Sequence, residues 1–199
     1  MLNVFASAQF LASAAQLTQL PPPDRPEIAF AGRSNSGKSS ALNLLCEHGG
    51  LARVSKTPGR TQLINFFEFA SGRLVDLPGY GFAQVPEEVR REWGQLVTGF
   101  IQTRENLAGI VLIMDIRRPM TPFDQQMLSW ATAEDLLCHV LLTKADKLSA
   151  SAQRKTLKDV ERALTGRASA QTFSSQSKQG AEEARRSLAG WLDIEAAPQ

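Results

Sequence analysis

The chain of 199 residues is long enough for one domain with a full hydrophobic core. Its 43% hydrophobic and 21% charged residues are typical of globular proteins and exclude a disordered chain. Its net charge of +2 leaves any role for basic residues to local clusters. Cys46 and Cys138 have neither a metal-ligand nor a disulfide spacing, so we expect both thiols to be reduced and buried.

The first 23 residues carry no charged side chain and end in three prolines, Pro21 to Pro23. A secretory signal needs a basic start, which is missing, and no later run approaches the roughly 18 apolar residues of a membrane span. We therefore expect a cytoplasmic protein that does not bind membranes. For the opening segment, a packed first helix and a disordered tail both fit Phe5, Phe10 and Leu17.

Beyond Asp24, short apolar runs alternate with amphipathic stretches. The predicted strands cover residues 27–31, 62–69, 73–77, 108–116, 138–143 and 170–174, and Ser71-Gly72 predicts a hairpin between the second and third. The predicted helices cover residues 38–47, a stretch that begins at Pro86, and residues 121–133, 151–164 and 180–192. This alternation predicts an α/β fold with a mostly parallel sheet and helices on both faces.

The first predicted strand is followed by a complete phosphate-loop pattern. Residues 32–39 read Gly-Arg-Ser-Asn-Ser-Gly-Lys-Ser and match G-x-x-x-x-G-K-[ST] between a strand and a helix. The glycines let backbone N–H groups approach a phosphate at the start of a helix. Lys38 supplies charge to the β- and γ-phosphates, and the Ser39 hydroxyl is a ligand for Mg²⁺. The pattern indicates a nucleoside triphosphate without selecting the base.

A second phosphate-sensing motif follows the predicted hairpin. Residues 76–79 read Asp-Leu-Pro-Gly and have the D-x-x-G form at a strand end. Asp76 can hold Mg²⁺ through a water, and the Gly79 N–H can meet the γ-phosphate. Downstream of a phosphate loop, this motif supports a nucleotide-dependent switch.

The base is indicated by residues 143–146, Thr-Lys-Ala-Asp, which resemble the guanine-selecting N/T-K-x-D element. The Asp146 carboxylate can accept hydrogen bonds from guanine N1–H and N2–H₂, and adenine offers neither donor there. The Lys144 stem would cover the face of the base. Residues 173–175, Phe-Ser-Ser, resemble the small-residue loop that presents a backbone N–H to guanine O6. Together these motifs predict GTP.

Residues 55–62 are rich in glycine, proline and polar side chains, so we expect a mobile first switch between the two phosphate motifs. A threonine there can complete the Mg²⁺ shell only while the γ-phosphate holds the loop. Thr57 and Thr61 both qualify by chemistry.

In this order the motifs resemble the translation-factor-related GTPases and fit the EngB family, also called YihA or YsxC, most closely. The resemblance spans roughly residues 24–192. The segments that carry it are residues 26–35 (PEIAFAGRSN), 57–62 (TPGRTQ), 76–81 (DLPGYG), 115–119 (DIRRP), 143–146 (TKAD) and 173–175 (FSS).

The resemblance implies a Ras-like P-loop GTPase fold, with a six-stranded sheet, one antiparallel edge strand and helices on both faces. It divides the chain into an N-terminal extension (1–23), an EngB-type G domain (24–195) and a C-terminal tail (196–199). It makes Thr61 the switch threonine and a protein ligand of Mg²⁺ beside Ser39, with Asp76 acting through water. The residues expected to bind GTP or GDP are Gly32, Arg33, Ser34, Asn35, Ser36, Gly37, Lys38, Ser39, Ser40, Gly59, Arg60, Thr61, Asp76, Leu77, Pro78, Gly79, Thr143, Lys144, Ala145, Asp146, Phe173, Ser174 and Ser175.

The family likeness also implies a function in assembly of the large ribosomal subunit, with normal cell division and septation depending on it. One position departs from Ras-like GTPases, because Tyr80 follows Gly79 where they carry the glutamine that orients the attacking water. Related GTPases with a hydrophobic residue there use a K⁺ ion held by a P-loop asparagine, the position of Asn35. We therefore expect a slow GTPase with Lys38, Asn35 and Thr61 in catalysis, Mg²⁺ as cofactor and K⁺ as a second ion.

Basic residues cluster around the first switch, at Arg53, Lys56 and Arg60. A second pair, Arg117 and Arg118, follows a strand end. We expect the switch cluster to contact RNA phosphates of the large ribosomal subunit, in a monomer that does not bind DNA. A third set, Arg90, Arg91 and Arg104, includes two residues surrounded by glutamates, which favours solvated surface charge.

The alternative function is a GTP-gated protein-binding module in division or translation with incidental hydrolysis. A small-molecule kinase has no use for the Thr-Lys-Ala-Asp motif.

Overall fold

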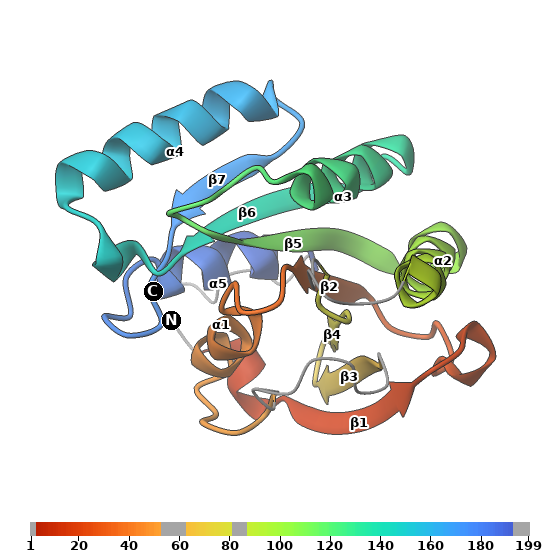
Figure 1. The fold of residues 1–199 in the computed structure, drawn as a ribbon. Helices are drawn as coiled ribbons and strands as arrows, with labels where there is room; N and C mark the ends of the chain where they lie inside the picture. The colour runs from red at the N-terminus through yellow and green to blue at the C-terminus, as the bar shows by residue number, and fades with distance from the viewer. Residues whose placement is uncertain (1–2, 53–62, 81–86, 193–199) are drawn as a thin grey trace.

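The computed structural model describes residues 3–52, 63–80 and 87–192. These residues form one α/β domain around a single sheet (Figure 1). The strands are β1 (Gln9–Ala14), β2 (Glu27–Gly32), β3 (Ile64–Phe69), β4 (Gly72–Asp76), β5 (Leu107–Asp115), β6 (Leu137–Thr143) and β7 (Ser169–Thr172). The α-helices are α1 (Lys38–Leu45), α2 (Glu87–Thr103), α3 (Pro122–Ala133), α4 (Ala150–Leu164) and α5 (Ala181–Gly190), joined by 3₁₀ turns at Val4–Ser7, Leu17–Gln19 and Ala145–Lys147.

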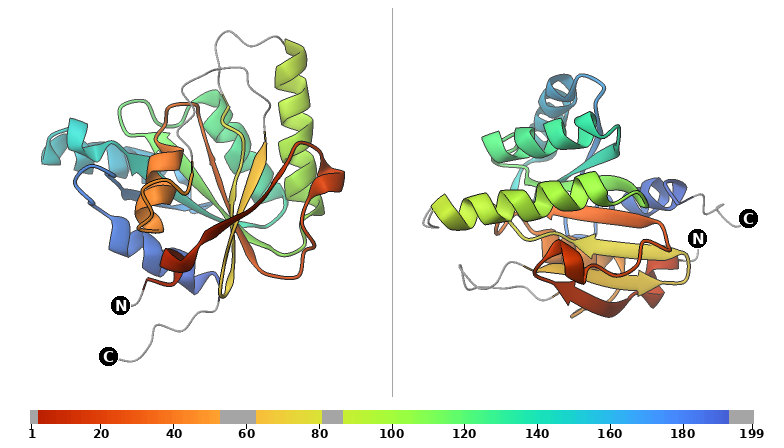
Figure 2. Two further views of the ribbon diagram at one scale, coloured as in Figure 1. Left: turned by 90° about the horizontal axis from the view of Figure 1, so that it is seen from below. Right: turned by 90° about the vertical axis from the view of Figure 1, so that its right-hand side faces the viewer.

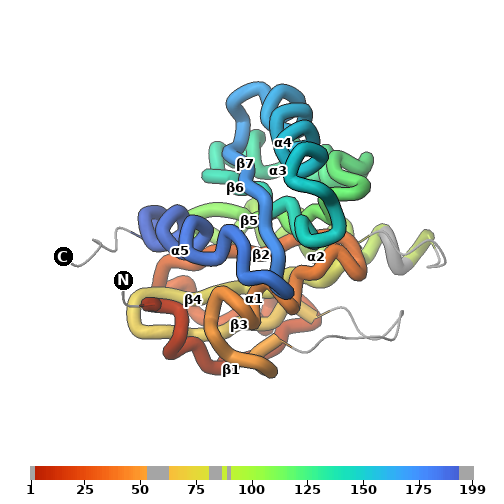
Figure 3. Tube along the Cα trace, turned by 90° about the vertical axis from the view of Figure 1, so that its left-hand side faces the viewer, coloured from red at the N-terminus to blue at the C-terminus, as the bar shows by residue number. Residues whose placement is uncertain are grey.

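The sheet has the strand order β1-β3-β4-β2-β5-β6-β7, which Figure 3 shows from β7 at the top to β1 at the bottom. The central strands β4, β2, β5, β6 and β7 are parallel, as the strand-helix alternation predicts. Strand β3 pairs antiparallel with β4, which confirms the hairpin expected at Ser71-Gly72. The carboxyl ends of the parallel strands therefore gather at one edge, where ligands bind in folds of this class.

The expectation of six strands with an antiparallel edge strand is wrong in one detail. There are seven strands, and antiparallel β3 is covered by β1, which forms the edge itself. Gln9 pairs with Glu68 and Ala14 with Ile64, and the register shifts between Phe10 and Ala12. After a 3₁₀ turn at Val4–Ser7, the opening segment is thus mainly an edge strand rather than an α-helix or a disordered tail, because β3 offers an open row of backbone groups that β1 satisfies.

Helices cover both faces of the sheet, as predicted, and each face has its own core (Figure 2). Helices α2, α3 and α4 bury apolar side chains on one face, and α1 and α5 on the other. Strand β5 serves both, since Leu112 and Met114 face the first core while Val111 and Ile113 face the second. Phe5 joins the second core and lies edge-on to Phe69, with ring centroids 5.2 Å apart.

Two smaller expectations can also be compared with the fold. Cys46 and Cys138 are both free thiols and buried, and burial raises the pKa of each to about 12. Within residues 3–52, 63–80 and 87–192, no helix has the length and apolar character needed to cross a bilayer.

Candidate nucleotide-binding site

The phosphate loop connects β2 to α1 and turns on two residues with positive φ. Gly37, the N-cap of α1, has a φ of +99°, and Asn35 has a φ of +63°, which asparagine tolerates better than most residues. At Gly32 an added Cβ would lie 2.7 Å from the Ile113 carbonyl oxygen, so only glycine lets the loop pack this closely on β5. The loop therefore leads directly into a helix N-terminus, whose N–H groups and dipole favour an anion.

Lys38 and Asp76 meet at this end of the sheet. Lys38 is the first residue of α1, Asp76 is the last residue of β4, and their side chains form a nearly buried ion pair. The two positions coincide because β2 and β4 are adjacent and parallel, with Phe30 opposite Asp76. The structure thus brings together the phosphate-loop lysine and the D-x-x-G aspartate that the sequence placed in separate motifs.

The oxygen donors around this ion pair fit Mg²⁺. Ser39 follows Lys38 in the first turn of α1, so a hydroxyl and the Asp76 carboxylate lie at the same end of the sheet. Mg²⁺ prefers hard oxygen ligands and takes few of them from the protein, keeping water and phosphate oxygens for the rest. Across the described ranges, no three His, Cys, Asp or Glu side chains form a self-sufficient metal site. The residues suit a Mg²⁺ ion bound together with a triphosphate.

The D-x-x-G segment runs directly beside the phosphate loop. The Ser34 N–H donates to the Tyr80 carbonyl at 2.8 Å, and the Tyr80 N–H donates to the Gly32 carbonyl at 3.3 Å. Gly79 directly precedes Tyr80, and a Cβ placed on it would be 3.5 Å from the Ser34 nitrogen. Movement of one loop is therefore linked to the other through backbone hydrogen bonds.

The Tyr80 side chain points away from the phosphate loop and into the core. Only 2% of it is exposed, and its ring lies against Trp93 and Phe123, with centroids 5.6 and 5.9 Å away. Its hydroxyl donates to Asp124 Oδ1 at 2.6 Å, while the Trp93 indole N–H donates to the Pro78 carbonyl at 3.0 Å. Burial, followed by the Asp124 charge, raises the pKa of Tyr80 well above its ordinary value. A side chain held this way cannot orient a water at the γ-phosphate.

The base-selecting residues lie together at the carboxyl ends of β6 and β7. The Ser174 hydroxyl donates to Asp146 Oδ1 at 2.6 Å, and the Ala145 N–H donates to the Phe173 carbonyl at 3.1 Å. Hydrogen bonds from Ser174, then from Lys147, hold the pKa of Asp146 below its ordinary value, so its carboxylate is ionised at neutral pH. A fixed carboxylate that can only accept hydrogen bonds suits guanine N1–H and N2–H₂.

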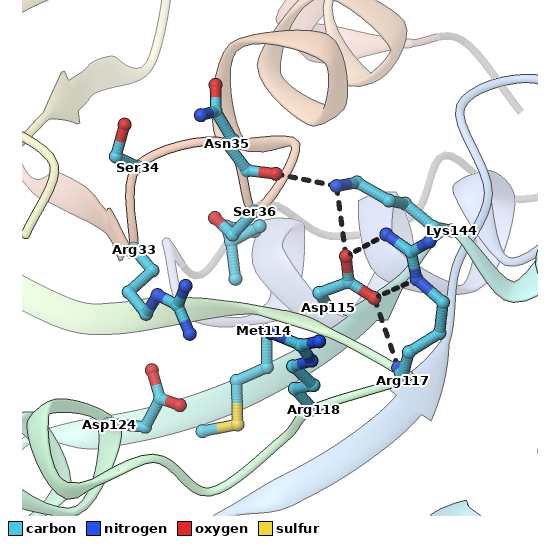
Figure 4. A pocket seen from close by; sticks show the side chains of 11 residues that line it. Arg33, Ser34, Asn35, Ser36, Met114, Asp115, Arg117, Arg118, Asp124 and Lys144 are labelled. Atoms are coloured by element: carbon cyan, nitrogen blue, oxygen red, sulfur yellow. Dashed lines mark hydrogen bonds and ion pairs between the residues drawn. The ribbon is translucent and has the colours of Figure 1, made fainter. Parts of the chain in front are cut away.

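Thr143 and Lys144 connect the base-selecting end to the phosphate loop. The Thr143 hydroxyl bonds to the Ser36 carbonyl, and the Lys144 ammonium donates to the Asn35 carbonyl at 2.6 Å. Lys144 also pairs with Asp115 Oδ2 at 3.0 Å (Figure 4). Thr143, where other GTPases carry asparagine, is therefore already engaged with the loop.

Two residues to which the sequence analysis gave no role support this site. Asp115 fixes Lys144 and is held by Arg117 through a 2.6 Å ion pair. Burial alone would raise the pKa of Asp115, but hydrogen bonds from Arg117 and Lys144 outweigh it and lower that pKa well below its usual range. Asp124 completes a capping box with Thr121, and the sequence signal for it is the [ST]-x-x-[DE] spacing.

Several expected site residues lie outside the described residues, namely Gly59, Arg60 and Thr61, together with Thr57 and the basic residues Arg53 and Lys56. Of the remaining positions, Ser40 is exposed on α1, Leu77 is buried, and Ser175 is half-buried beside Ser174. The side chain of Asn35 points away from the Asp115–Lys144 pair in Figure 4, and Asn35 itself is exposed.

The family of this chain follows from its similarity to known proteins. The model of the 50S ribosome-binding GTPase family matches residues 27–165. The probable GTP-binding protein EngB of Thiobacillus denitrificans is 56% identical over 197 residues, covering 98% of this chain and 95% of that protein. The chain belongs to the EngB family. The protein of the same name from Aromatoleum aromaticum is 54% identical and covers 97% of this chain and 91% of its own length.

Solved structures agree on the fold. A probable GTP-binding protein engB superposes with a TM-score of 0.69 at 22% identity, covering 84% of this chain and 98% of that one. A bacterial selenocysteine-specific elongation factor gives a TM-score of 0.64 at 18% identity, over 86% of this chain and 29% of that one. Membership of the EngB family, with the P-loop GTPase fold, makes this protein a GTP-binding GTPase. P-loop GTPases generally use Mg²⁺.

Proposed function

We propose that this EngB-family protein is a slow GTPase switch that acts in assembly of the large ribosomal subunit. Normal cell division and septation then depend on it through the supply of ribosomes. The match to the 50S ribosome-binding GTPase model carries the proposal, because it names the partner class over residues 27–165. We place the activity in a G domain of residues 24–195, with residues 1–23 and 196–199 as its extensions, in a cytoplasmic monomer that binds neither DNA nor membranes.

For the nucleotide, we assign the β- and γ-phosphates to the backbone of residues 32–39 and to Lys38. Asp146, Lys144 and residues 173–175 hold guanine, the lysine stem covering its face. The Ser174–Asp146 bond supports this assignment, because it fixes the orientation of the carboxylate. We also retain the other residues named in the sequence analysis as residues that bind GTP or GDP.

For the metal, we assign Mg²⁺ to the hydroxyls of Ser39 and Thr61, with Asp76 acting through a water. When bound, this ion neutralises charge on the phosphate oxygens. The Lys38–Asp76 ion pair supports the assignment, since both side chains are already at the phosphate-binding end of the sheet. Thr61 would make the protein sensitive to the γ-phosphate, because its hydroxyl would join the coordination shell of Mg²⁺ only in the GTP state.

The slow rate follows from Tyr80. Its hydroxyl is bonded to Asp124 and its ring is buried, so it supplies no group that activates water. We propose that K⁺ held near Asn35 adds the positive charge that stabilises the transition state, together with Lys38. The exposure of Asn35 on the phosphate loop supports this role.

The proposed function is tested by sedimenting the purified full chain with purified bacterial large ribosomal subunits in GTP and in GDP. Co-sedimentation in GTP that is lost in GDP is expected. Binding that is absent or indifferent to the nucleotide would contradict the proposal and favour the GTP-gated protein-binding module. The Asp146→Asn variant is the matched control, because its binding should follow xanthosine rather than guanosine nucleotides.

A further inference from the structure

A cavity of about 470 Å³ lies beside the phosphate loop, between that loop and the turn that joins β5 to α3 (Figure 4). It is lined by Arg33, Ser34, Asn35, Ser36, Ile113, Met114, Asp115, Arg117, Arg118, Asp124 and Lys144. Lys38, Ser39, Asp76, Asp146 and Ser174 do not line it. The cavity therefore adjoins the nucleotide site: it shares residues 33–36 and Lys144 with the positions assigned above to GTP, and extends from them to the β5–α3 turn.

The charged groups on its wall fall into two classes. Asp115 is occupied by Arg117 and Lys144, so these three side chains largely satisfy one another. Asp124 accepts hydrogen bonds from the Tyr80 hydroxyl and from Thr121. Both carboxylates on the wall are thus already engaged by other groups.

Arg33 and Arg118 differ from these two carboxylates in their contacts. Within the described part of the chain, neither guanidinium has a hydrogen bond or an ion pair. Figure 4 shows Arg33 entering from the phosphate loop and Arg118 from the β5–α3 turn, on either side of Met114. The wall thus carries a net charge of +2 that comes from these two arginines.

The backbone holds both arginines in position. The Ser36 N–H donates to the Arg33 carbonyl at 2.9 Å, and the Arg118 N–H donates to the Asp115 carbonyl at 2.9 Å. The turn is fixed further by Arg117, whose N–H donates to Asp115 Oδ1 at 3.0 Å. These hydrogen bonds restrain the backbone of both turns, which limits the ordering cost of binding an anion.

We propose that this Arg33–Arg118 cavity binds a phosphodiester group of RNA on the large ribosomal subunit, an inference that rests on the proposed function. Guanidinium groups present planar pairs of N–H donors that match phosphate oxygens. Arg33 belongs to the phosphate loop, so bound RNA contacts the same loop as the nucleotide.

The test replaces Arg118, because Arg33 belongs to the nucleotide-binding loop. Arg118→Ala and Arg118→Lys are compared with Arg154→Ala, which removes the same charge from an exposed position on α4. Affinity for purified bacterial large subunits is measured in GTP over a range of salt concentrations, and GDP affinity is measured separately. Arg118→Ala is expected to bind subunits roughly tenfold more weakly, with a salt slope lower by about one, while GDP affinity is unchanged.

The other variants separate the outcomes. Arg118→Lys is expected to keep the salt slope and lose only part of the affinity, because a lysine still neutralises a phosphate. If Arg118→Ala behaves like Arg154→Ala while the wild type binds subunits, the cavity proposal is overturned and the proposed function stands. If the wild type does not bind subunits, the proposed function itself fails. Arg118→Ala can also be tested on large-subunit rRNA freed of protein. If it binds whole subunits more weakly than the wild type but binds this rRNA equally well, Arg118 contacts an acidic protein, and the RNA assignment is overturned.

Discussion

The hydroxyl of Tyr80 donates a 2.6 Å hydrogen bond to Asp124, although 44 residues separate them in the chain. Tyr80 follows the D-x-x-G segment next to the phosphate loop, and Asp124 belongs to the capping box of α3. The bond therefore ties the phosphate-sensing segment to a helix on one face of the sheet. The bond also leaves the Tyr80 hydroxyl in the core, away from the phosphate loop.

Tyr80→Phe should lower the free energy of unfolding by about 2 kcal/mol, because it removes one buried hydrogen bond to a carboxylate but keeps the ring packing. Chemical denaturation measures this loss, and GTP turnover under saturating GTP should change less than twofold. A large fall in turnover by a variant that remains folded would show that the hydroxyl acts in catalysis. Thr132→Val, which removes a half-buried hydroxyl bond within α3, is the control for stability alone.

Asp146→Asn should change the base that the protein prefers. The asparagine amide can donate to the C2 carbonyl of xanthine, whereas it cannot accept both guanine donors as a carboxylate does. We expect GDP affinity to fall at least 100-fold and XDP affinity to rise, as measured by titration of fluorescent nucleotides. Equal loss of both nucleotides would mean that Asp146 holds the loop rather than the base.

Turnover of GTP should be faster in K⁺ than in Na⁺ at equal ionic strength and Mg²⁺, because only K⁺ is expected to fit beside Asn35. Asn35→Ala should remove this difference and leave GDP affinity within a fewfold of the wild type. Single-turnover hydrolysis measures the chemical step. Equal wild-type rates in the two salts would rule out the K⁺ assignment.

His139 should make the fold less stable as the pH falls. It is 4% exposed and lies between Ser169 and Gln171, and burial lowers its pKa below the ordinary value of 6.5. Below pH 6.5 the unfolded chain therefore binds a proton that the folded chain excludes, so stability is lost as the pH falls from 7 towards 5.

Denaturation at several pH values measures this slope. His139→Gln should flatten it in that range, whereas His48→Gln, which changes an exposed histidine, should leave it as in the wild type. The carboxylates with lowered pKa values, Asp24, Asp115 and Asp146, lose their contribution only at lower pH. A slope unchanged by His139→Gln would contradict the prediction.

Much of this protein could be predicted from local sequence. The strand-loop-helix at residues 27–45 and the helix that begins at Thr121 depend on periodicity, glycine positions and caps within a few residues. The parallel order of the sheet follows from strand-helix alternation, and the family likeness follows from short motifs. Each is recognisable because its physical cause lies within one segment of the chain.

The tertiary structure alone decided the contacts between distant segments. The pairing of β1 with β3 depends on an open backbone edge some 50 residues away, so the composition of residues 1–23 could not reveal it. The same holds for the direction of the Tyr80 ring, the Asp115–Lys144 pair and the placement of Arg33 and Arg118 on the wall of one cavity. Sequence determined which chemical groups this protein has, and packing determined which are occupied and which face a ligand, because burial and pairing are set only when the sheet assembles.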